Sequence, residues 1–209
     1  MRCELDHLVV ACKDLEQGTR WVAERLGVEP ADGGKHPLMG THNRVLKIAA
    51  RAYLELIAID PDAPAPGRPR WFDLDSPELQ ARIAQSPALV TWAVRTDRIA
   101  EALTHVPELG SVHAATRGAL SWQITIPDEG KLQFGGLLPT VLQWGDAHPT
   151  DTMQDSGCEL AELALTHPMS AGLVPMFRAL RIAGPVDLRA GPKALVARLR
   201  TPRGDIELS

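Results

Sequence analysis

Two ionisable residues, His7 and Glu55, each lie within an apolar run that is typical of a β-strand. Strand alternation places His7 on the same face as Leu5 and Val9. Because a buried charge without a partner is costly, each of the two side chains needs one. An imidazole nitrogen and a carboxylate oxygen suit Zn²⁺, Fe²⁺, Mn²⁺ or Ni²⁺. A hydrogen bond between His7 and Glu55 would satisfy both groups without a metal.

A glycine-rich polar segment contains two further candidates, His36 and Asn43. Backbone N–H groups of such a segment can lie against a carboxylate or a phosphate. The alternative is a long hairpin connection in which Asn43 satisfies the backbone of a turn. The segment has neither the GxGxxG nor the P-loop pattern, which argues against nucleotide binding.

Arg117, Trp122, Trp144 and His148 form a second group of candidates for contact with a ligand. Arg117 precedes a predicted strand, where it could bind an anionic substrate or face solvent. Trp122 falls on the apolar face of that strand, which favours core packing. Trp144 ends a later strand and His148 follows it, where a turn-capping role competes with a functional one.

The elements that must position these residues repeat along the chain. Residues 1–60 and 88–149 each show a strand, an amphipathic helix and three further strands, and residues 157–209 show the same order again. Helices that precede three consecutive strands predict an α+β fold rather than a doubly wound sheet. We therefore expect a domain of two βαβββ units over residues 1–150, followed by a third unit.

A stretch with six prolines, residues 60–87, separates the first two units and is interpreted as a linker or covering loop. Ser76 would cap one short helix within it, with Pro77 at the first helical position. The third unit has no sequence-adjacent partner. Since half a cup would expose an apolar sheet face, we expect this unit to pair with its twin in a homodimer.

Composition limits the class of protein. The chain has 209 residues, 44% hydrophobic and 23% charged, with a net charge of −4, which is typical of a globular protein that binds neither nucleic acid nor a membrane. There is no apolar signal segment, and three cysteines without CxxC spacing favour a reducing, cytoplasmic location. Nucleophile motifs such as GxSxG are absent.

The run Leu5–Val10, followed by Asp14 and a helix that ends at Gly27, resembles the opening of the vicinal oxygen chelate superfamily, and residues 53–57 resemble its last strand. Segments around Gly40–Asn43, 117–122 and 138–149 are similar to a narrower group, the glyoxalase-like domain proteins. The resemblance covers most of residues 4–165, whereas the third unit matches only by element order. It implies paired units whose sheets curl into a cup around a divalent metal, with helices on the outside.

The resemblance also implies metal ligands from the first and last strands of both paired units, typically His and Glu. The first unit offers His7 and Glu55, whereas Trp92 and Gln143 stand at the matching positions of the second. The implied set is therefore His7, Glu55 and Gln143. Trp cannot ligate a metal and an amide oxygen is a weak ligand for a transition metal, so this is a half-site.

A different pairing, between the first and third units, would add Glu162 and Glu207 to His7 and Glu55. One imidazole and three carboxylates would suit Mn²⁺ or Fe²⁺. Solvated carboxylates on edge strands are the alternative for these two residues.

Together these observations predict a glyoxalase-like protein that binds a small carbonyl- or carboxylate-bearing metabolite in the cup. With a divalent ion as Lewis acid it would be a lyase, isomerase or dioxygenase. The alternatives are a metal-free binding or sequestering module of the resistance type and a cup filled by its own side chains. The residues expected to contact the ligand are His36, Asn43, Arg117, Trp122, Trp144 and His148.

Overall fold

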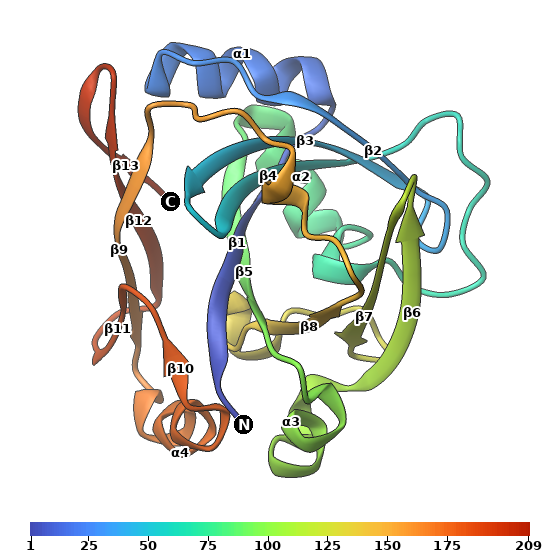
Figure 1. Cartoon of the computed structure of the whole chain (residues 1–209), viewed down its shortest axis with the longest axis vertical. Coiled ribbons are helices and arrows are strands. Elements are labelled where there is room, and N and C mark those ends of the chain that lie inside the picture. The colour runs from blue at the N-terminus through green and yellow to red at the C-terminus, as the bar shows by residue number, and fades with distance from the viewer.

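The computed structural model describes residues 1–209, and nine of its strands form one strongly curled sheet (Figure 1). The first repeat contains β1 (Cys3–Ala11), α1 (Leu15–Leu26), β2 (Ala31–His36), β3 (Thr41–Ala49) and β4 (Ala52–Ile59). The second repeat contains β5 (Ala88–Arg95), α3 (Ile99–His105), β6 (Ser111–Arg117), β7 (Leu120–Ile126) and β8 (Thr140–Trp144). The ninth strand of the sheet, β10 (Ile182–Ala183), comes from the third unit and pairs with β1. The predicted α+β fold with two βαβββ repeats is confirmed.

The two halves have the same internal arrangement. The strand order is β2-β3-β4-β1-β5-β8-β7-β6, with β1 parallel to β4, β5 parallel to β8, and the halves joined by antiparallel β1 and β5. Buried residues of α1 and α3 pack against the convex side of this sheet, as predicted. The concave side of the sheet, which we call the cup, encloses a second, separate apolar cluster.

Local capping interactions determine both ends of helix α1. The Asp14 side chain accepts a hydrogen bond of 2.7 Å from the Gln17 N–H, and Gly27 ends the helix with φ of 76°. A side-chain acceptor at the N-cap and a left-handed glycine after the last turn are both favourable ends for a helix. Trp21, Val22 and Leu26 are buried on its inner face.

The third unit forms its own four-stranded sheet, and its strand arrangement differs from that of the other two. It contains β9 (Glu159–His167), α4 (Ser170–Leu180), β10 (Ile182–Ala183), β11 (Val186–Ala190), β12 (Ala194–Thr201) and β13 (Gly204–Leu208). The order is β11-β9-β12-β13, whereas the βαβββ units place their first strand at the end of the order. Strand β10 leaves this sheet and pairs with β1.

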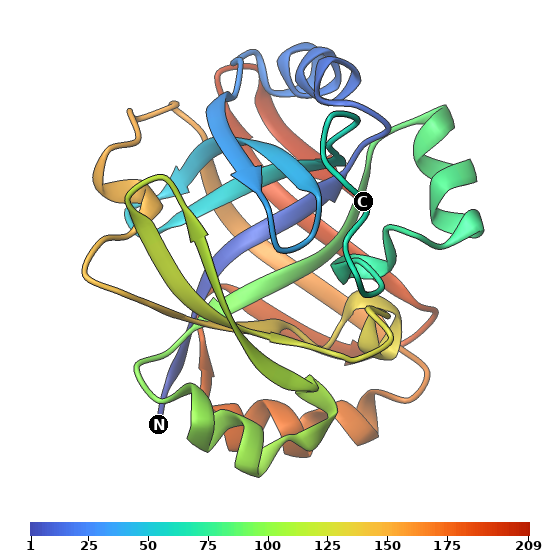
Figure 2. The same cartoon turned by 90° about the vertical axis from the view of Figure 1, so that its right-hand side faces the viewer.

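This small sheet covers the convex side of the large one within the same chain (Figures 1 and 2). Leu163, Leu165 and Leu199 belong to the same buried cluster as Leu8 and Trp92 of the large sheet. The expected exposed apolar face is therefore absent, and the reason for predicting a homodimer through the third unit does not hold.

The carboxylates of the third unit take no part in the cup. Glu162 and Glu207 both form ion pairs with Arg198 on the outer surface of the small sheet. The set of His7, Glu55, Glu162 and Glu207 as metal ligands is therefore wrong. The alternative of a solvated carboxylate on an edge strand holds for Glu207 on β13, whereas Glu162 lies half-buried on the interior strand β9.

The proline-rich segment 60–87 closes the cup. It contains a short 3₁₀ helix, η1 (Trp71–Asp73), and α2 (Pro77–Gln85), which the Ser76 side chain caps by accepting from the Leu79 N–H at 3.2 Å. Trp71 and Phe72 are buried in the cluster on the concave side. The segment is thus a covering loop as well as a linker.

No helix of the chain is long and apolar enough to cross a membrane.

Truncating a leucine of the small sheet tests its packing against the large one. We expect Leu163→Ala, at a fully buried position, to lower the free energy of unfolding by about 2–5 kcal/mol, because it removes buried apolar contacts and leaves a cavity. Leu188→Ala, at a half-buried position on strand β11, serves as the control with a smaller loss. Urea denaturation measures both, and equal losses would contradict the described packing.

Candidate functional site

A β-bulge in β1 aims two ionisable side chains into the cup. Leu5 pairs with Val94 and His7 with Ala93, which leaves Asp6 as an extra residue between them. Asp6 and His7 hydrogen-bond to one another, while Leu5 joins the cluster on the convex side. The prediction that Leu5 and His7 share a face is therefore wrong, because the bulge interrupts the alternation.

The Asp6 carboxylate is fully buried and collects donors from both halves of the sheet. Its Oδ1 lies 2.7 Å from His7 Nδ1, and its Oδ2 lies 2.9 Å from Trp144 Nε1 and 3.0 Å from His148 Nε2. Burial raises the pKa of Asp6, but the bonds to His148 and His7 outweigh it and hold this pKa well below its ordinary value. Asp6 is therefore ionised at physiological pH and can only accept hydrogen bonds.

These contacts fix the two histidines. Because Asp6 only accepts, the Nδ1–H of His7 donates to it, and the His7 ring stacks on Tyr53 with centroids 4.7 Å apart. The Thr150 N–H donates to His148 Nδ1, so His148 donates to Asp6 through Nε2–H. His7 Nε2 is left facing Glu55, with 3.6 Å between Nε2 and Oε2.

A chain of polar groups continues from His7 to the edge of the cup. The Asn43 amide donates to Glu55 Oε1 at 2.5 Å, and Arg117 Nη1 donates to Asn43 Oδ1 at 2.8 Å. The backbone N–H of Gly34 donates to the same Oδ1 at 3.0 Å. The half-buried Arg117 forms no ion pair.

The glycines of this region lie in strand β2 and make room for protein side chains. A Cβ atom at Gly33 would lie 2.0 Å from Asn43 Oδ1, and one at Gly34 would lie 2.9 Å from Arg117 Cδ. These close approaches explain why both positions lack a side chain. The predicted ligand-binding loop is therefore a strand that Asn43 and Arg117 approach closely.

Aromatic side chains form the remaining walls. The His36 ring meets Trp71 and Trp122 edge-on, with centroids 5.3 and 6.1 Å apart, and its Nδ1 lies 3.1 Å from Thr41 Oγ1. The pKa of His36 is lowered to about 4, mainly because the ring is buried; Glu55 opposes this shift and Arg117 adds to it. His36 is therefore neutral at physiological pH.

These side chains leave very little space between them. The cavity has a volume of about 20 Å³, which is the space needed by a single water molecule. A groove of about 1050 Å³ lies beside it, and Arg117 lines both the cavity and the groove. Arg117 thus stands at the boundary between the interior of the cup and solvent.

Most predicted site residues lie in or beside this network. The structure brings together His7, Glu55, His36, Asn43, Arg117, Trp122, Trp144 and His148. Sequence reasoning missed Asp6, Tyr53, Trp71 and Phe72. Asp6 carried a usable signal, since it is a second ionisable residue in an apolar run, and the Trp71–Phe72 pair stood out in a proline-rich segment.

Gln143 is not part of the cup. Its Oε1 accepts a hydrogen bond of 3.0 Å from the Ile99 N–H at the start of α3. Trp92, its supposed partner, likewise points to the convex side, where its Nε1 donates to the Leu137 carbonyl. The neighbouring residues Ala93 and Leu142 face inward instead. The prediction of Gln143 as a metal ligand is wrong by one residue along the strand.

The donor set of the cup does not fit a divalent metal. Catalytic zinc sites commonly use three protein ligands, and His7 and Glu55 supply two. No three His, Cys, Asp or Glu side chains of the chain are arranged to hold an ion. Glu55 Oε1 is already bonded to Asn43, and the inward positions of the second half, Ala93 and Leu142, carry no ligand atoms.

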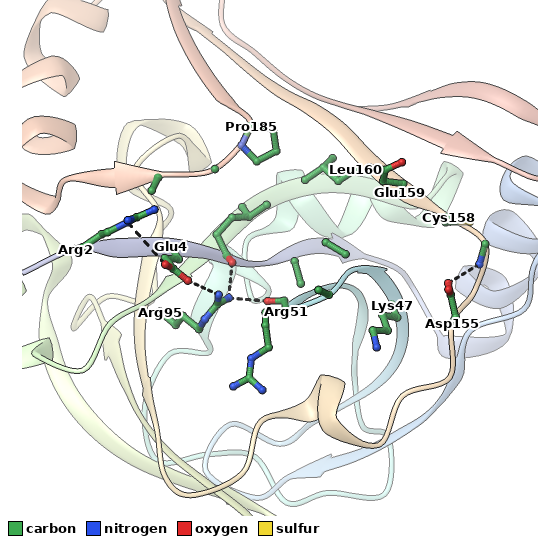
Figure 3. Close-up of a pocket in the computed structure, with 17 residues that line it drawn as sticks. Arg2, Glu4, Lys47, Arg51, Arg95, Asp155, Cys158, Glu159, Leu160 and Pro185 are labelled. Carbon is green, nitrogen blue, oxygen red and sulfur yellow. Dashed lines mark hydrogen bonds and ion pairs between the residues drawn. The ribbon is translucent and has the colours of Figure 1, made fainter.

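A second hollow, of about 790 Å³, lies between the large sheet and the third unit (Figure 3). Its most buried charged group, Arg95, is paired with Glu4 at 2.6 Å and donates to the carbonyls of Leu5 and Arg51. This arginine ties the β3–β4 turn to β1. Arg95 Nη1 also lies 3.8 Å from Asp6 Oδ2, so this arginine stands behind the carboxylate at the base of the cup.

The curled sheet of paired βαβββ units and its polar cup define a glyoxalase-like protein. The sequence pattern of the family described as a glyoxalase-like domain matches residues 5–180, so the chain belongs to this family. No curated protein matches the chain by sequence.

The chain is also similar to solved structures at low sequence identity. A hypothetical protein from Staphylococcus aureus is 14% identical, with a TM-score of 0.59 over 99% of this chain and 84% of that chain. A methylmalonyl-CoA epimerase solved with methylmalonyl-CoA and NH₄⁺ is 16% identical, with a TM-score of 0.46 over 71% of this chain and 99% of the epimerase. The epimerase from Mycobacterium tuberculosis is 16% identical, with a TM-score of 0.42 over 71% of this chain and 91% of that chain.

The neutral state of His36 makes stability depend on pH. The pKa of His36 is about 4 in the folded protein, below its ordinary value of 6.5. Between these two pH values His36 is protonated in the unfolded chain but stays neutral in the folded protein, so the free energy of unfolding falls as the pH falls. The wild type should therefore lose about 2.5 kcal/mol more stability than His36→Asn between about pH 7 and about pH 4.5. Urea denaturation at the two pH values checks this, and parallel losses would contradict it.

Proposed function

We propose that this chain binds a small carboxylate- or carbonyl-bearing metabolite in the cup, without a resident metal ion. The observation that carries the proposal is Arg117, a cation at the edge of the cup that forms no ion pair. A guanidinium group presents several donors in a fork that matches a carboxylate. Its Nη1 bond to the neutral Asn43 leaves the charge available for an anion.

The rest of the network would orient such a ligand. His7 Nε2 and Glu55 Oε2 face one another at 3.6 Å and are polar atoms deep in the cup. With its carboxylate on Arg117, a ligand with a hydroxyl or amine would donate to these two atoms directly. The carbonyl of a 2-oxo acid would reach them through one bridging water, which donates both to the carbonyl and to His7 Nε2 or Glu55 Oε2. Trp122 and Trp144, with centroids 5.1 Å apart, would enclose its apolar part. Few polar groups in an otherwise aromatic pocket are typical of small-molecule sites.

The metal-dependent version of this function has weaker support. A lyase, isomerase or dioxygenase of that type requires an ion held by the cup, and the donor set of His7 and Glu55 is incomplete for it. The metal-free binding module therefore accounts for more of the residues. A cytoplasmic location stays part of the proposal, because all three cysteines are buried and unpaired.

The affinity for pyruvate, a small 2-oxo acid that carries both groups, tests the proposal. Tryptophan fluorescence should report saturable binding, because Trp122 and Trp144 line the cup. Arg117→Ala should weaken binding by about 10- to 100-fold, since it removes a charged hydrogen-bond donor. Arg200→Ala, on the exposed outer face of the third unit, is the matched control and should leave the affinity unchanged.

Two results would contradict the proposal. One is an Arg117→Ala variant that binds pyruvate as tightly as the wild type and the control do. The other is the absence of saturable binding for pyruvate, oxalate and 2-oxobutyrate at millimolar concentration.

A further inference from the structure

We infer that Trp71 and Phe72 form a self-occupying lid, which fills the place of the ligand in the cup and withdraws when the ligand binds. The inference rests on the proposed function, because it concerns access to the same site. It assigns a regulatory role to the linker segment Arg70–Asp75.

The closed cup is too small for the proposed ligand. The cavity of about 20 Å³ admits one water molecule, whereas pyruvate has six heavy atoms. Trp71 and Phe72 are 4% and 6% exposed and stack on each other with ring centroids 5.3 Å apart. A metabolite can therefore enter only if lining side chains move.

Trp71 and Phe72 are the two lining side chains that do not belong to the sheet. Every other residue around the cavity belongs to a strand of the large sheet, whereas Trp71 and Phe72 come from η1 in the linker. The strand residues are fixed by ladder hydrogen bonds between neighbouring strands. Movement of the linker therefore opens the cup at the least structural cost.

The backbone of the lid has few bonds to the rest of the protein. Within Arg70–Asp75, the Asp73 N–H donates to the Gly130 carbonyl at 2.9 Å, and no other backbone hydrogen bond leaves the segment toward the sheet halves. Arg70 bonds to Asp75, which keeps those contacts inside the segment. Segments with few external hydrogen bonds open locally at low free energy.

The closed lid also holds two unfavourable features. Phe72 and Asp73 have φ of 58° and 60°, a left-handed conformation that is unfavourable for residues other than glycine. The Trp71 indole N–H is buried without a hydrogen-bond partner, which is costly. Opening would relieve the backbone strain and return this N–H to water, so both features favour withdrawal.

Hydrogen exchange of the ligand-free protein tests the lid without any ligand. The Asp73 amide should exchange on the order of 100-fold faster than the buried amides of β1 and β4, through local opening. It should still exchange more slowly than an unprotected amide. Exchange as slow as that of the strands would overturn the inference, since the lid would then open only with global unfolding. Exchange at the unprotected rate would overturn it too, since the closed lid would not be populated.

A pair of tryptophan variants tests the coupling to ligand. Trp71→Ala should bind pyruvate about tenfold more tightly than the wild type, because the free energy of opening is no longer needed. Trp21→Ala, which removes a buried tryptophan of α1 on the convex side, should leave the affinity unchanged. Phe72→Ala repeats the test if Trp71→Ala does not fold. Unchanged or weaker binding in the folded lid variants would overturn the inference.

The failure of the lid and the failure of the proposed function are distinguishable. Wild-type binding that depends on Arg117, together with no gain in the lid variants, removes the lid alone. A locally opening Asp73 amide in a protein whose wild type and lid variants all fail to bind the 2-oxo acids supports the lid and removes the proposed ligand class.

Discussion

The buried carboxylate of Asp6 is the interaction on which the cup depends. It accepts from His7 in the first half of the sheet and from Trp144 and His148 at the end of the second. A buried ion is tolerable only when its hydrogen bonds are satisfied, so these three donors and the bulge that aims Asp6 inward must form together. The two halves are thereby joined by a polar contact inside the cup as well as by the β1–β5 ladder.

From this carboxylate a continuous series of polar contacts reaches the solvent boundary. His7 faces Glu55, Glu55 accepts from Asn43, and Asn43 accepts from Arg117. Anionic groups lie at the base of the series and an unpaired cation lies at its edge. That polarity suits a small anion whose hydroxyl or amine enters first, and it differs from the ring of three or more ligands that a metal requires.

Much of this could be predicted from the sequence where local rules decide the outcome. Asp14 and Gly27 end a helix by local capping, and the alternating apolar residues predicted the strands of both repeats. The prediction for Gln143 was wrong because a shift of one residue in register exchanges the two faces of a strand. No local signal marked which residue of β8 faces inward. The bulge at Asp6 depends on tertiary hydrogen bonds, so the pattern of the strand alone could not place it. The small sheet of the third unit has a different strand order, which the succession of elements along the chain does not determine.

We propose that the polar residues of the cup bind an organic ligand rather than a metal ion. Calorimetric titration of chelator-treated wild type and His7→Ala with Zn²⁺ tests it most directly, because zinc binds imidazole and carboxylate groups well. We expect less than about a tenth of an equivalent of tightly bound zinc, with the same heat in both proteins. Stoichiometric binding of Zn²⁺ by the wild type that disappears in His7→Ala would contradict it.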